Sequence, residues 1–507
     1  MFKLRPHQKK QNKATLKALK HHNHILYGMA TGGGKSVCMY DLIEKFIGKG
    51  KRVLVLAPFR KLVFQLEKTF TYLQPHVVMG NIDRGNVKSG LILSSLDTMN
   101  NRIKKGSNYF NDIDIIIGDE VHISYNFPPK KGSRMETLYN MYWDSAKFIG
   151  FTATPITSSG YRLEGWDKTI YKYQTEKLIK MGFLVDYDYY APVDLDLSDL
   201  RVASTGEYVL DDVEEVTNTA TAIDSVKKVW KDNCKNKKVL IFAASIKHAE
   251  LLQKAIEGSM VVHSKLSDKQ QMQILNDFEN SSWGTLINVN MLIAGFDSPS
   301  VDTMIIARPI KSISNYIQCA GRVLRLDPAN KSKKATIYDM CSCYKSCGLP
   351  SDRRDFNKVK KVEDIKKKDK DEDEISAMKC ALCDEVSPRA DFKVKKKTTK
   401  KSITTKYWCP VCGKLCKESR QDLSEIKKMQ KVKKKKIKKL NYADRKVIVS
   451  KLVTEFTKSN PKWSHYILTI INKADKSELL DQAIAKGTTD KTLWKKIMKL
   501  YEDSKNV

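Results

Sequence analysis

The sequence predicts an α/β protein in which two lobes each contain a mostly parallel β-sheet. Short apolar runs rich in β-branched residues alternate with segments of helical periodicity; examples of the runs are 53–56 (VLVL), 113–117 (IDIII) and 239–242 (VLIF). Buried parallel strands have this appearance because helices cover both faces of their sheet. The alternation runs through residues 1–190 and is repeated after residue 223, which favours two lobes over a single sheet.

The chain has 507 residues, which is too long for a single hydrophobic core because domains usually contain about 100–200 residues. Shifts in charge and composition divide it into six segments. We expect a first lobe at 1–192, an acidic connector or small excursion at 193–222, a second lobe at 223–347, a charged flexible linker or solvated helix at 348–375, a cysteine-containing element at 376–420, and a basic helical region at 421–507.

The formal net charge is +33, of which residues 351–507 carry +20. A balance this basic favours a polyanionic partner, nucleic acid above all, over unspecific solubility. No run of about 20 apolar residues occurs, so we expect no membrane span. The N-terminal segment MFKLRPHQKK has no apolar stretch typical of a signal peptide. We therefore expect a cytoplasmic, nucleoid-associated protein.

The most specific motif is the glycine-rich segment 30–36, Ala-Thr-Gly-Gly-Gly-Lys-Ser. It follows the apolar piece 25–27 and precedes a helical segment; a strand, a glycine loop and a helix in this order form a phosphate cradle. In such a cradle, Lys35 reaches the β- and γ-phosphates and the Ser36 hydroxyl ligates Mg²⁺. The general pattern has glycine where this chain has Met29. The residues expected to surround the phosphates are Thr31, Gly32, Gly33, Gly34, Lys35 and Ser36.

An acidic pair follows the apolar run 113–118, which we expect to be a strand. The residues are Asp119 and Glu120, in the sequence Asp-Glu-Val-His. A phosphate cradle needs an acidic metal partner at a strand end, so Asp119 is expected to hold Mg²⁺, directly or through water. Glu120 is expected to position or deprotonate the attacking water.

With these two motifs the chain resembles the superfamily 2 helicases, whose second motif has the form D-E-x-H. The resemblance implies two RecA-like lobes and ATP as the nucleotide. The segment 4–8 (LRPHQ) looks like the adenine-reading segment of that family, with Arg5 and Gln8 as its contacts and Phe2 as a candidate for stacking.

Further segments resemble helicase motifs in the family's order. The segments 57–60 (APFR) and 94–98 (SSLDT) are similar to loops that touch the nucleic-acid backbone. The segment 151–155 (FTATP) is similar to the motif that couples hydrolysis to movement of the lobes, and 239–245 (VLIFAAS) is similar to motif IV. In 288–297, Gly295 and Asp297 match the G-x-D element of motif V, and Asp297 is a candidate for ribose contact or coupling.

The segment 318–325 (QCAGRVLR) matches Q-x-x-G-R-x-x-R, the sixth motif of the family. The resemblance implies that Gln318 contributes to the nucleotide site and that Arg322 and Arg325 are the arginine-finger candidates. An arginine of this kind stabilises charge on the transferred phosphoryl group and contributes about 10³-fold or more to the rate. Because it comes from the opposite lobe, hydrolysis requires the cleft to close.

Four cysteines form two C-x-x-C pairs in the segment 376–420: Cys380 and Cys383, then Cys409 and Cys412. Each pair directs two thiolates at one ion, and two pairs complete a tetrahedral site, so structural zinc is expected. The spacing exceeds the usual template, but the intervening loop is mostly charged and can bulge. Cys416 is an alternative fourth ligand.

A second cysteine cluster lies at 341–347 (CSCYKSC) and lacks an apparent fourth ligand. We interpret these thiols as small buried hydrophobes at the end of the second lobe, with a redox or iron–sulfur role as the minor alternative. A nuclease framed by the two C-x-x-C pairs is disfavoured because its chemistry needs a nearby histidine. The last histidine, His465, is far from the pairs in the sequence.

The lysine-rich run 424–440 is interpreted as a helix lying on phosphates, with a solvated helix face as the alternative. The segment 459–466 (SNPKWSHY) resembles the C-terminal module of RadD-type bacterial DNA-repair helicases, which also carry a four-cysteine zinc element after the helicase core. The core is also similar to bacteriophage recombination helicases of superfamily 2.

These resemblances imply an ATP-dependent DNA helicase or translocase that needs ATP, Mg²⁺ and Zn²⁺. Its partner is expected to be duplex, forked or branched DNA, bound largely without sequence preference because such loops grip phosphates rather than bases. It is expected to unwind or branch-migrate duplexes in replication, recombination or repair. Two alternatives stay open: an RNA helicase, and a DNA-stimulated ATPase switch that binds without unwinding.

Overall fold

The computed structural model of the chain describes residues 2–356, 377–398 and 402–422, apart from the segment 290–297 and the single positions 124, 126, 158, 194, 196 and 204. The predicted motif V residues Gly295 and Asp297 lie outside the described residues. The basic run 424–440 and the segment 459–466 lie outside them as well.

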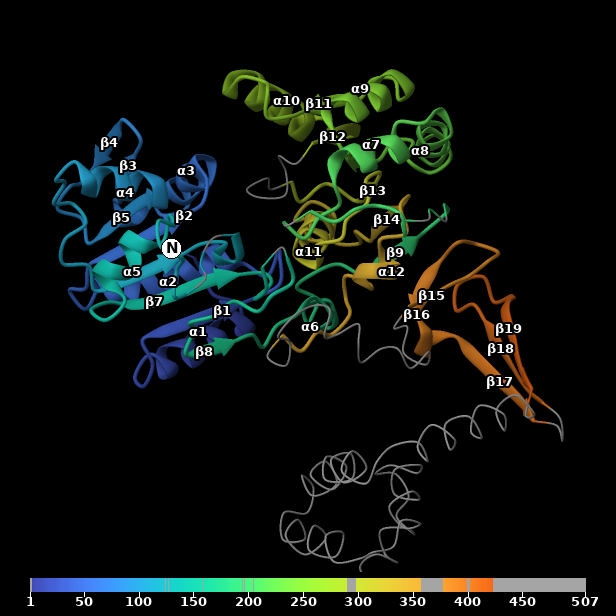
Figure 1. Ribbon diagram of the computed structural model, residues 1–507, viewed down its shortest axis with the longest axis horizontal. Helices are drawn as coiled ribbons and strands as arrows, with labels where there is room; N and C mark the ends of the chain where they lie inside the picture. The colour runs from blue at the N-terminus through green and yellow to red at the C-terminus, as the bar shows by residue number, and fades with distance from the viewer. Residues whose placement is uncertain are drawn as a thin grey trace, which may run out of the picture. The chain divides into compact units, whose positions relative to one another are not determined.

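The first lobe contains an eight-stranded sheet with the order β4-β3-β5-β2-β6-β7-β1-β8 (Figure 1). Every strand is parallel to its neighbours except β4, which pairs antiparallel with β3 at the edge. Strand β2 shows how the sheet is buried, because Val53 and Val55 enter one core cluster and Leu54 and Leu56 enter another on the opposite face. The strands are β1 (His24–Gly28), β2 (Val53–Ala57), β3 (His76–Met79), β4 (Ile82–Gly85), β5 (Leu91–Ser95), β6 (Ile115–Gly118), β7 (Lys147–Thr152) and β8 (Lys168–Ile170).

Six α-helices accompany this sheet in the described part of the first lobe. Of these, α2, α3 and α4 bury a mainly apolar face, as expected of helices that cover a sheet, whereas α1 buries polar side chains. They are α1 (Pro6–Ala18), α2 (Lys35–Ile47), α3 (Arg60–Thr69), α4 (Leu96–Lys104), α5 (Glu136–Tyr142) and α6 (Thr175–Lys180); the 3₁₀ turns are η1 (Thr71–Leu73) and η2 (Val121–Ile123). The expected motifs follow the carboxyl ends of β1, β2, β5, β6 and β7. Those ends share one edge of the parallel sheet, where ligands of open α/β sheets bind.

The second lobe contains a six-stranded, fully parallel sheet with the order β11-β12-β10-β13-β14-β9. The strands are β9 (Tyr187–Tyr190), β10 (Lys238–Phe242), β11 (Met260–Val262), β12 (Gly284–Asn288), β13 (Thr303–Ile306) and β14 (Ala335–Asp339). Strand β9 precedes the expected lobe boundary at residue 192, yet it pairs with β14. That boundary is therefore corrected: the chain enters the second lobe before residue 187.

The helices of the second lobe are α7 (Leu210–Thr217), α8 (Ala220–Asn233), α9 (Ile246–Ala255), α10 (Asp268–Asn280), α11 (Ile313–Val323) and α12 (Tyr344–Cys347). The expected connector at 193–222 contains α7 and the start of α8. It also supplies Glu207, whose carboxylate accepts hydrogen bonds from the backbone of Lys311 and Ser312 and from the Asn315 side chain at the start of α11. Of the two alternatives for residues 193–222, a connector or a small excursion, the packed helices favour the excursion. Through Glu207 the segment also caps α11, the helix that carries the sixth motif.

The first part of the expected linker at 348–375 is packed rather than solvated. Arg354 and Gln174 exchange two hydrogen bonds, and Phe356 stacks on Tyr171 with ring centroids 5.6 Å apart. The aromatic contact explains why this stretch folds back, because Phe356 is 6% exposed there. The rest of the expected linker, residues 357–375, lies outside the described residues.

The cysteine-containing element begins with the hairpin β15 (Ala377–Lys379) and β16 (Val386–Pro388), followed by η3 (Arg389–Asp391). A backbone bridge joins Glu385 of this hairpin region to Tyr190 of β9. A second compact unit contains the antiparallel sheet β17-β18-β19. Its strands are β17 (Lys393–Thr398), β18 (Ser402–Trp408) and β19 (Leu415–Asp422).

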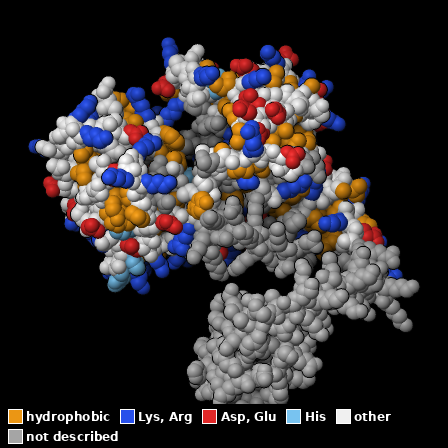
Figure 2. All heavy atoms as spheres, viewed as in Figure 1, with side chains coloured by type: hydrophobic (Ala, Val, Ile, Leu, Met, Phe, Trp, Pro, Cys, Tyr) orange, Lys and Arg blue, Asp and Glu red, His pale blue; other side chains and the backbone are white. Residues whose placement is uncertain are grey.

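None of the helices in the described part of the chain has both the length and the apolar character needed to cross a bilayer. Lys and Arg side chains are spread over the visible face of both lobes rather than gathered into one patch (Figure 2). On this face the positive charge therefore does not mark out one binding surface.

Candidate active site

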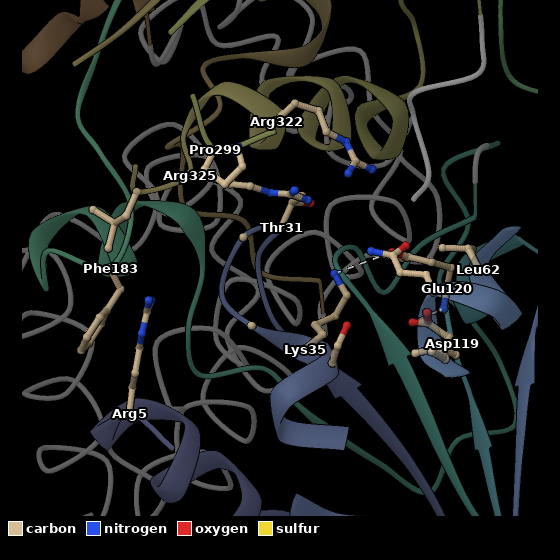
Figure 3. Close-up of a pocket in the computed structure, with 16 residues that line it drawn as sticks. Arg5, Thr31, Lys35, Leu62, Asp119, Glu120, Phe183, Pro299, Arg322 and Arg325 are labelled. Atoms are coloured by element: carbon tan, nitrogen blue, oxygen red, sulfur yellow. Dashed lines mark hydrogen bonds and ion pairs between the residues drawn. The ribbon is translucent and has the colours of Figure 1, made fainter. Parts of the chain in front are cut away.

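A cavity of about 270 Å³ lies where the two lobes meet (Figure 3). The first lobe contributes the glycine loop and the acidic pair, and the second contributes residues at and beyond the end of α11. The lining residues are Arg5, Thr31, Gly32, Gly34, Lys35, Ser36, Leu62, Gln65, Leu66, Asp119, Glu120, Phe183, Pro299, Arg322, Arg325 and Leu326. Four cationic and two anionic side chains meet there, so the cavity suits a polyanionic ligand.

The glycine loop joins β1 directly to α2, and the start of α1 braces it from behind. Gln8 Nε2 donates to the Gly33 carbonyl at 3.1 Å, while its Oε1 accepts from the Arg5 amide at 2.8 Å. Gly34 has φ = +85°, and a Cβ there would lie 2.2 Å from Gln8 Nε2. Only glycine fits this backbone. Gln8 therefore shapes the loop through Gly33 instead of lining the cavity.

The acidic pair sits at the end of β6 and faces the loop lysine. Lys35 Nζ lies 3.8 Å from Glu120 Oε1, the contact drawn in Figure 3. Glu120 adopts φ = +47°, an uncommon conformation for a residue with a side chain, and its amide donates to Asp119 Oδ1 at 3.0 Å. Strain of this kind is found at functional sites where the surroundings impose it.

Burial and neighbouring charges separate the two carboxyl groups. Burial first, and then the Glu120 charge, raise the pKa of Asp119 to about 7. Burial also acts to raise the pKa of Glu120, but the positive charges of Lys35 and Arg322 outweigh it and leave that pKa lowered. Glu120 is therefore ionised near neutral pH, as a hydrogen-bond acceptor for water must be.

His122 connects the acidic pair to the second lobe. Burial lowers its pKa, so the ring is neutral. Gln318 Nε2 donates to His122 Nε2 at 2.7 Å, which leaves the proton on Nδ1, facing Thr152 Oγ1 at 3.2 Å. The Thr152 hydroxyl itself donates to the Thr154 carbonyl at 2.7 Å. The Gln318 side chain thus bonds to His122 and is not among the residues that line the cavity, and its contact with the nucleotide stays a prediction.

One face of α11 lies against the first lobe. Ser314, Gln318 and Arg322 are spaced at four-residue intervals and so share this face. The Ser314 hydroxyl lies 2.6 Å from Thr154 Oγ1, with both side chains buried. Gly321 packs so closely that a Cβ on it would lie 2.3 Å from Thr31 Cβ. Helix and loop are therefore in direct contact.

Both arginine-finger candidates extend from α11 and the following turn into the cavity (Figure 3). Arg325 passes the glycine loop, with its Cγ 3.3 Å from where a Cβ on Gly32 would lie. Arg322 is close enough to Glu120 to lower the pKa of that carboxyl group. Both guanidinium groups thus enter the cavity from the second lobe.

Phe183 is the cavity residue that motif reasoning missed. It follows α6, and the Arg5 guanidinium lies over its ring at 5.4 Å from the centroid (Figure 3). The candidate stacker Phe2 packs edge-on against Tyr40 and is not among the residues that line the cavity. No sequence motif marks Phe183, since only the fold returns the chain to the start of α1.

The four predicted zinc ligands come together. The Sγ atoms of Cys380, Cys383, Cys409 and Cys412 all lie within 4.8 Å of one another, the one such cluster of possible metal ligands among the described residues. Burial opposes ionisation of Cys380, but the amides of Leu382 and Cys383 and two neighbouring thiols lower its pKa to about 7. Four thiols of this kind suit a tetrahedral zinc site. Cys416 is not part of the cluster; its thiol donates to the Tyr407 carbonyl at 3.4 Å.

The cysteines of the second cluster are buried in the second lobe, as expected of small hydrophobes. Burial raises the pKa of Cys347 to about 12, and its thiol donates to the Ile310 carbonyl at 3.4 Å. These thiols therefore remain protonated and pack in the core.

Comparison with known proteins agrees with this arrangement. Residues 1–157 match the family "Type III restriction enzyme, res subunit", and residues 221–327 match "Helicase conserved C-terminal domain". A 51.5 kDa protein of a Lactococcus phage is 26% identical over 370 residues, which are 70% of this chain and 74% of that protein. The putative ATP-dependent helicase IRC3 of Saccharomyces cerevisiae is 28% identical over 324 residues, which are 59% of this chain and less than half, 46%, of that protein.

Among solved structures, the fragment of a putative HsdR subunit of a type I restriction enzyme from Vibrio vulnificus has a TM-score of 0.52 at 21% identity. The match covers 70% of this chain and 66% of that one, and it shows a shared fold.

Two RecA-like lobes with a phosphate loop, an acidic pair and opposed arginines define a helicase-type ATPase core. The chain belongs to the superfamily 2 helicases. Membership implies nucleotide-dependent ATPase activity with ATP and Mg²⁺.

Proposed function

We propose that the chain is a motor that hydrolyses ATP on DNA in order to unwind or branch-migrate duplexes in replication, recombination or repair. The observation that carries the proposal is the meeting of Lys35, Glu120 and two arginines from the opposite lobe in one cavity. Hydrolysis in such a site depends on how the lobes are placed, so the site can convert ATP turnover into movement.

Lys35 is proposed to hold the β- and γ-phosphates. Its present partner is Glu120, at 3.8 Å, so an arriving triphosphate would compete for the ammonium group and free the Glu120 carboxylate. Glu120 would then accept a hydrogen bond from the attacking water and take its proton. Its lowered pKa keeps it ionised for this role, since a protonated carboxyl group could not accept the proton.

Ser36 and Asp119 are proposed to hold Mg²⁺, which when bound neutralises phosphate charge. The site fits a cation because the Asp119 carboxyl group is buried beside Glu120, and both carboxyl groups gain from positive charge there. Arg322 and Arg325 would approach the transferred phosphoryl group from the second lobe and stabilise its charge.

The contacts of α11 are proposed to link turnover to lobe movement. Gln318 is hydrogen-bonded to His122, so its position depends on how the acidic pair beside His122 is arranged. Ser314 is hydrogen-bonded to Thr154 of the expected coupling motif. These bonds cross between the lobes, so a change at the phosphates alters which of them can form. Opening and closing would then advance one lobe along a strand relative to the other.

Arg5 and Phe183 are proposed to receive the nucleobase. An aromatic ring with a guanidinium over it offers a flat, cationic surface at one end of the cavity, and bases stack on such surfaces. The loops after β2 and β5 lie next to each other, because Ala57 pairs with Ser95, and they are proposed to grip the DNA backbone.

DNA is preferred over RNA because the family matched by the first lobe is named for restriction enzymes, which act on DNA. A role in repair or recombination is proposed from the resemblance of the four-cysteine element and the segment 459–466 to RadD-type helicases. The zinc ion is proposed to hold the two C-x-x-C turns together.

A substrate panel tests the proposal. ATP hydrolysis by the full chain is measured with single-stranded, duplex, forked and four-way DNA and with RNA, and strand displacement is followed on the forked and four-way substrates. We expect stimulation by DNA together with displacement. Stimulation by RNA alone would overturn the DNA assignment, and stimulation by DNA without displacement would reduce the chain to an ATPase switch.

Three variants test the site itself. Lys35→Ala should abolish hydrolysis, and turnover at the wild-type rate would overturn the whole assignment. Arg325→Ala should bind a fluorescent ATP analogue nearly as tightly as wild type while hydrolysis falls about 10³-fold. Lys331→Ala, an exposed lysine of the same lobe, is the control and should hydrolyse ATP normally. Unchanged turnover in Arg325→Ala would remove that residue from the finger role.

A further inference from the structure

The sheet β17–β19, in the second compact unit, has one strongly basic face. Side chains alternate between the faces of a strand, so Lys393, Lys395 and Lys397 of β17 point to the same side. All three are exposed. Their register partners on β18 are Trp408, Lys406 and Thr404, which share that side. We call Lys393, Lys395, Lys397, Lys406 and Trp408 the basic face.

The side of the sheet opposite the basic face is more deeply buried. On the middle strand β18, Thr405 is 8% exposed and Tyr407 is 7% exposed, and both point away from the basic face. Lys406 and Trp408, their neighbours in the strand, are only half-buried. The sheet thus packs through one side of β18 and leaves the other accessible.

The charges of the basic face are poorly compensated within the sheet. Neither β17 nor β18 contains an acidic residue. On β19, Glu418 pairs with Lys406, with Nζ and Oε2 3.0 Å apart. Lys395 Nζ lies 5.7 Å from the centre of the Trp408 ring, so the indole of Trp408 lies among lysine side chains of the basic face. An aromatic platform inside a basic groove is the arrangement used by proteins that bind single strands.

The indole of Trp408 favours a single strand over a duplex. In a duplex each base is paired and stacked between its neighbours, so its faces are covered and an exposed aromatic ring cannot stack on them. A single strand presents free base faces to an indole that lies beside Lys395, while its phosphates stay open to the lysines.

We propose that the basic face binds single-stranded nucleic acid, with the lysines on phosphates and Trp408 stacked on a base. This second binding surface rests on the proposed function only in that the partner is a nucleic acid. It would keep the chain on a strand that the motor has separated, whatever the state of the ATP cavity.

Binding of the full chain to a fluorescent dT oligonucleotide, without ATP and across a range of salt, tests the charge part. Lys395→Gln/Lys397→Gln is compared with Lys414→Gln/Lys417→Gln, which removes the same charge from exposed lysines of the same sheet region outside the basic face. The first variant should bind about tenfold more weakly, and its plot of log affinity against log salt should be shallower by about 1.4. The second should match wild type. Equal behaviour of the two variants would overturn the proposal.

An abasic oligonucleotide of the same length tests the stacking part, because it keeps the phosphates and lacks the bases. Trp408→Ala should weaken dT binding roughly 5- to 150-fold and bind dT and abasic strands alike. Because Trp408 precedes a proposed zinc ligand, zinc content is measured for each variant, and Trp408→Phe should restore most of the dT preference. A dT preference retained by a zinc-loaded Trp408→Ala protein would refute the stacking role.

Failure of this proposal and failure of the motor assignment remain distinguishable. In the Lys395→Gln/Lys397→Gln protein, ATP hydrolysis at saturating DNA should stay at the wild-type rate, while the DNA concentration for half-maximal stimulation rises. If nucleic acid never stimulated ATP hydrolysis, the motor assignment would be wrong, whereas the binding of the oligonucleotide measured without ATP would still support the basic face. Displacement of the dT strand from wild type by an equal charge of polyglutamate would indicate an acidic protein partner and overturn the single-strand assignment.

Discussion

The contact between Gly321 and Thr31 makes a sharp prediction about the substitution Gly321→Ala. The added Cβ would lie 2.3 Å from Thr31 Cβ and 2.6 Å from its Cγ2. Carbon atoms in ordinary contact are about 3.5–4.0 Å apart, so helix and loop must separate by about 1 Å. Thr31 cannot swing away easily, because a β-branched side chain is stiff and its Cβ is fixed to the backbone.

The magnitude follows from what lies on each side of that contact. Gly321 precedes Arg322 on α11, and Thr31 lies four residues before Lys35, so the displacement moves the arginines away from the phosphate site. A misplacement of about 1 Å can cost about 10²-fold in rate. We expect kcat for stimulated ATP hydrolysis to fall by about that factor. Folding should not suffer, because alanine is favoured over glycine by about 1 kcal/mol inside a helix and the lobes can part to relieve the clash.

The assay is phosphate release at saturating ATP and DNA, together with thermal unfolding of the unliganded protein. Gly90→Ala is the matched control, because the nearest atoms to its added Cβ lie 3.4–3.5 Å away. It should hydrolyse ATP at the wild-type rate. A Gly321→Ala protein that keeps kcat within threefold of wild type would refute the inference that α11 must touch the glycine loop during turnover.

The remaining predictions concern the base, the metal and pH. Phe183→Ala should raise KM for ATP roughly 5- to 150-fold with little change in kcat, whereas Phe2→Ala should leave both near wild type; equal effects would dismiss Phe183 as the base platform. Elemental analysis should find about one zinc per chain and less in Cys380→Ser, and a folded metal-free protein would exclude the site. Burial lowers the pKa of His248 to about 4, so the native state resists its protonation. Below the unfolded pKa of about 6.5 the unfolded chain binds a proton at this histidine and the folded chain does not. The free energy of unfolding therefore falls as the pH is lowered from about 6.5 toward 4, by up to about 3 kcal/mol. Urea unfolding at pH 7.5 and 4.5 measures this loss, and a His248→Asn protein that loses as much stability as wild type would contradict it.

Local pattern was sufficient for much of the fold and site. The runs 53–56 and 239–242 became β2 and β10, because a strand buried on both faces must be apolar throughout. Lys35, Asp119 and Glu120 were predicted for the same kind of reason: a phosphate loop and an acidic strand end are each made within a few consecutive residues.

Contacts between residues far apart in the chain could not be predicted from the sequence. Strand β9 reads like the end of the first lobe, yet it pairs with β14, more than 140 residues later. Gln318 carries a motif that implies nucleotide contact, but its partner is His122. Phe183 has no motif at all and reaches the cavity only because the chain returns past α1.

The sequence by itself determined the class of this protein, because phosphate binding and parallel strands leave signatures that are local in the chain. Only the tertiary structure decided that β9 belongs to the second lobe, that α11 lies against the glycine loop and that Phe183 lines the cavity. The physical reason is the same in each case. Such contacts join residues far apart in sequence, and their free energy depends on how packed elements fit together, which no short window of residues contains.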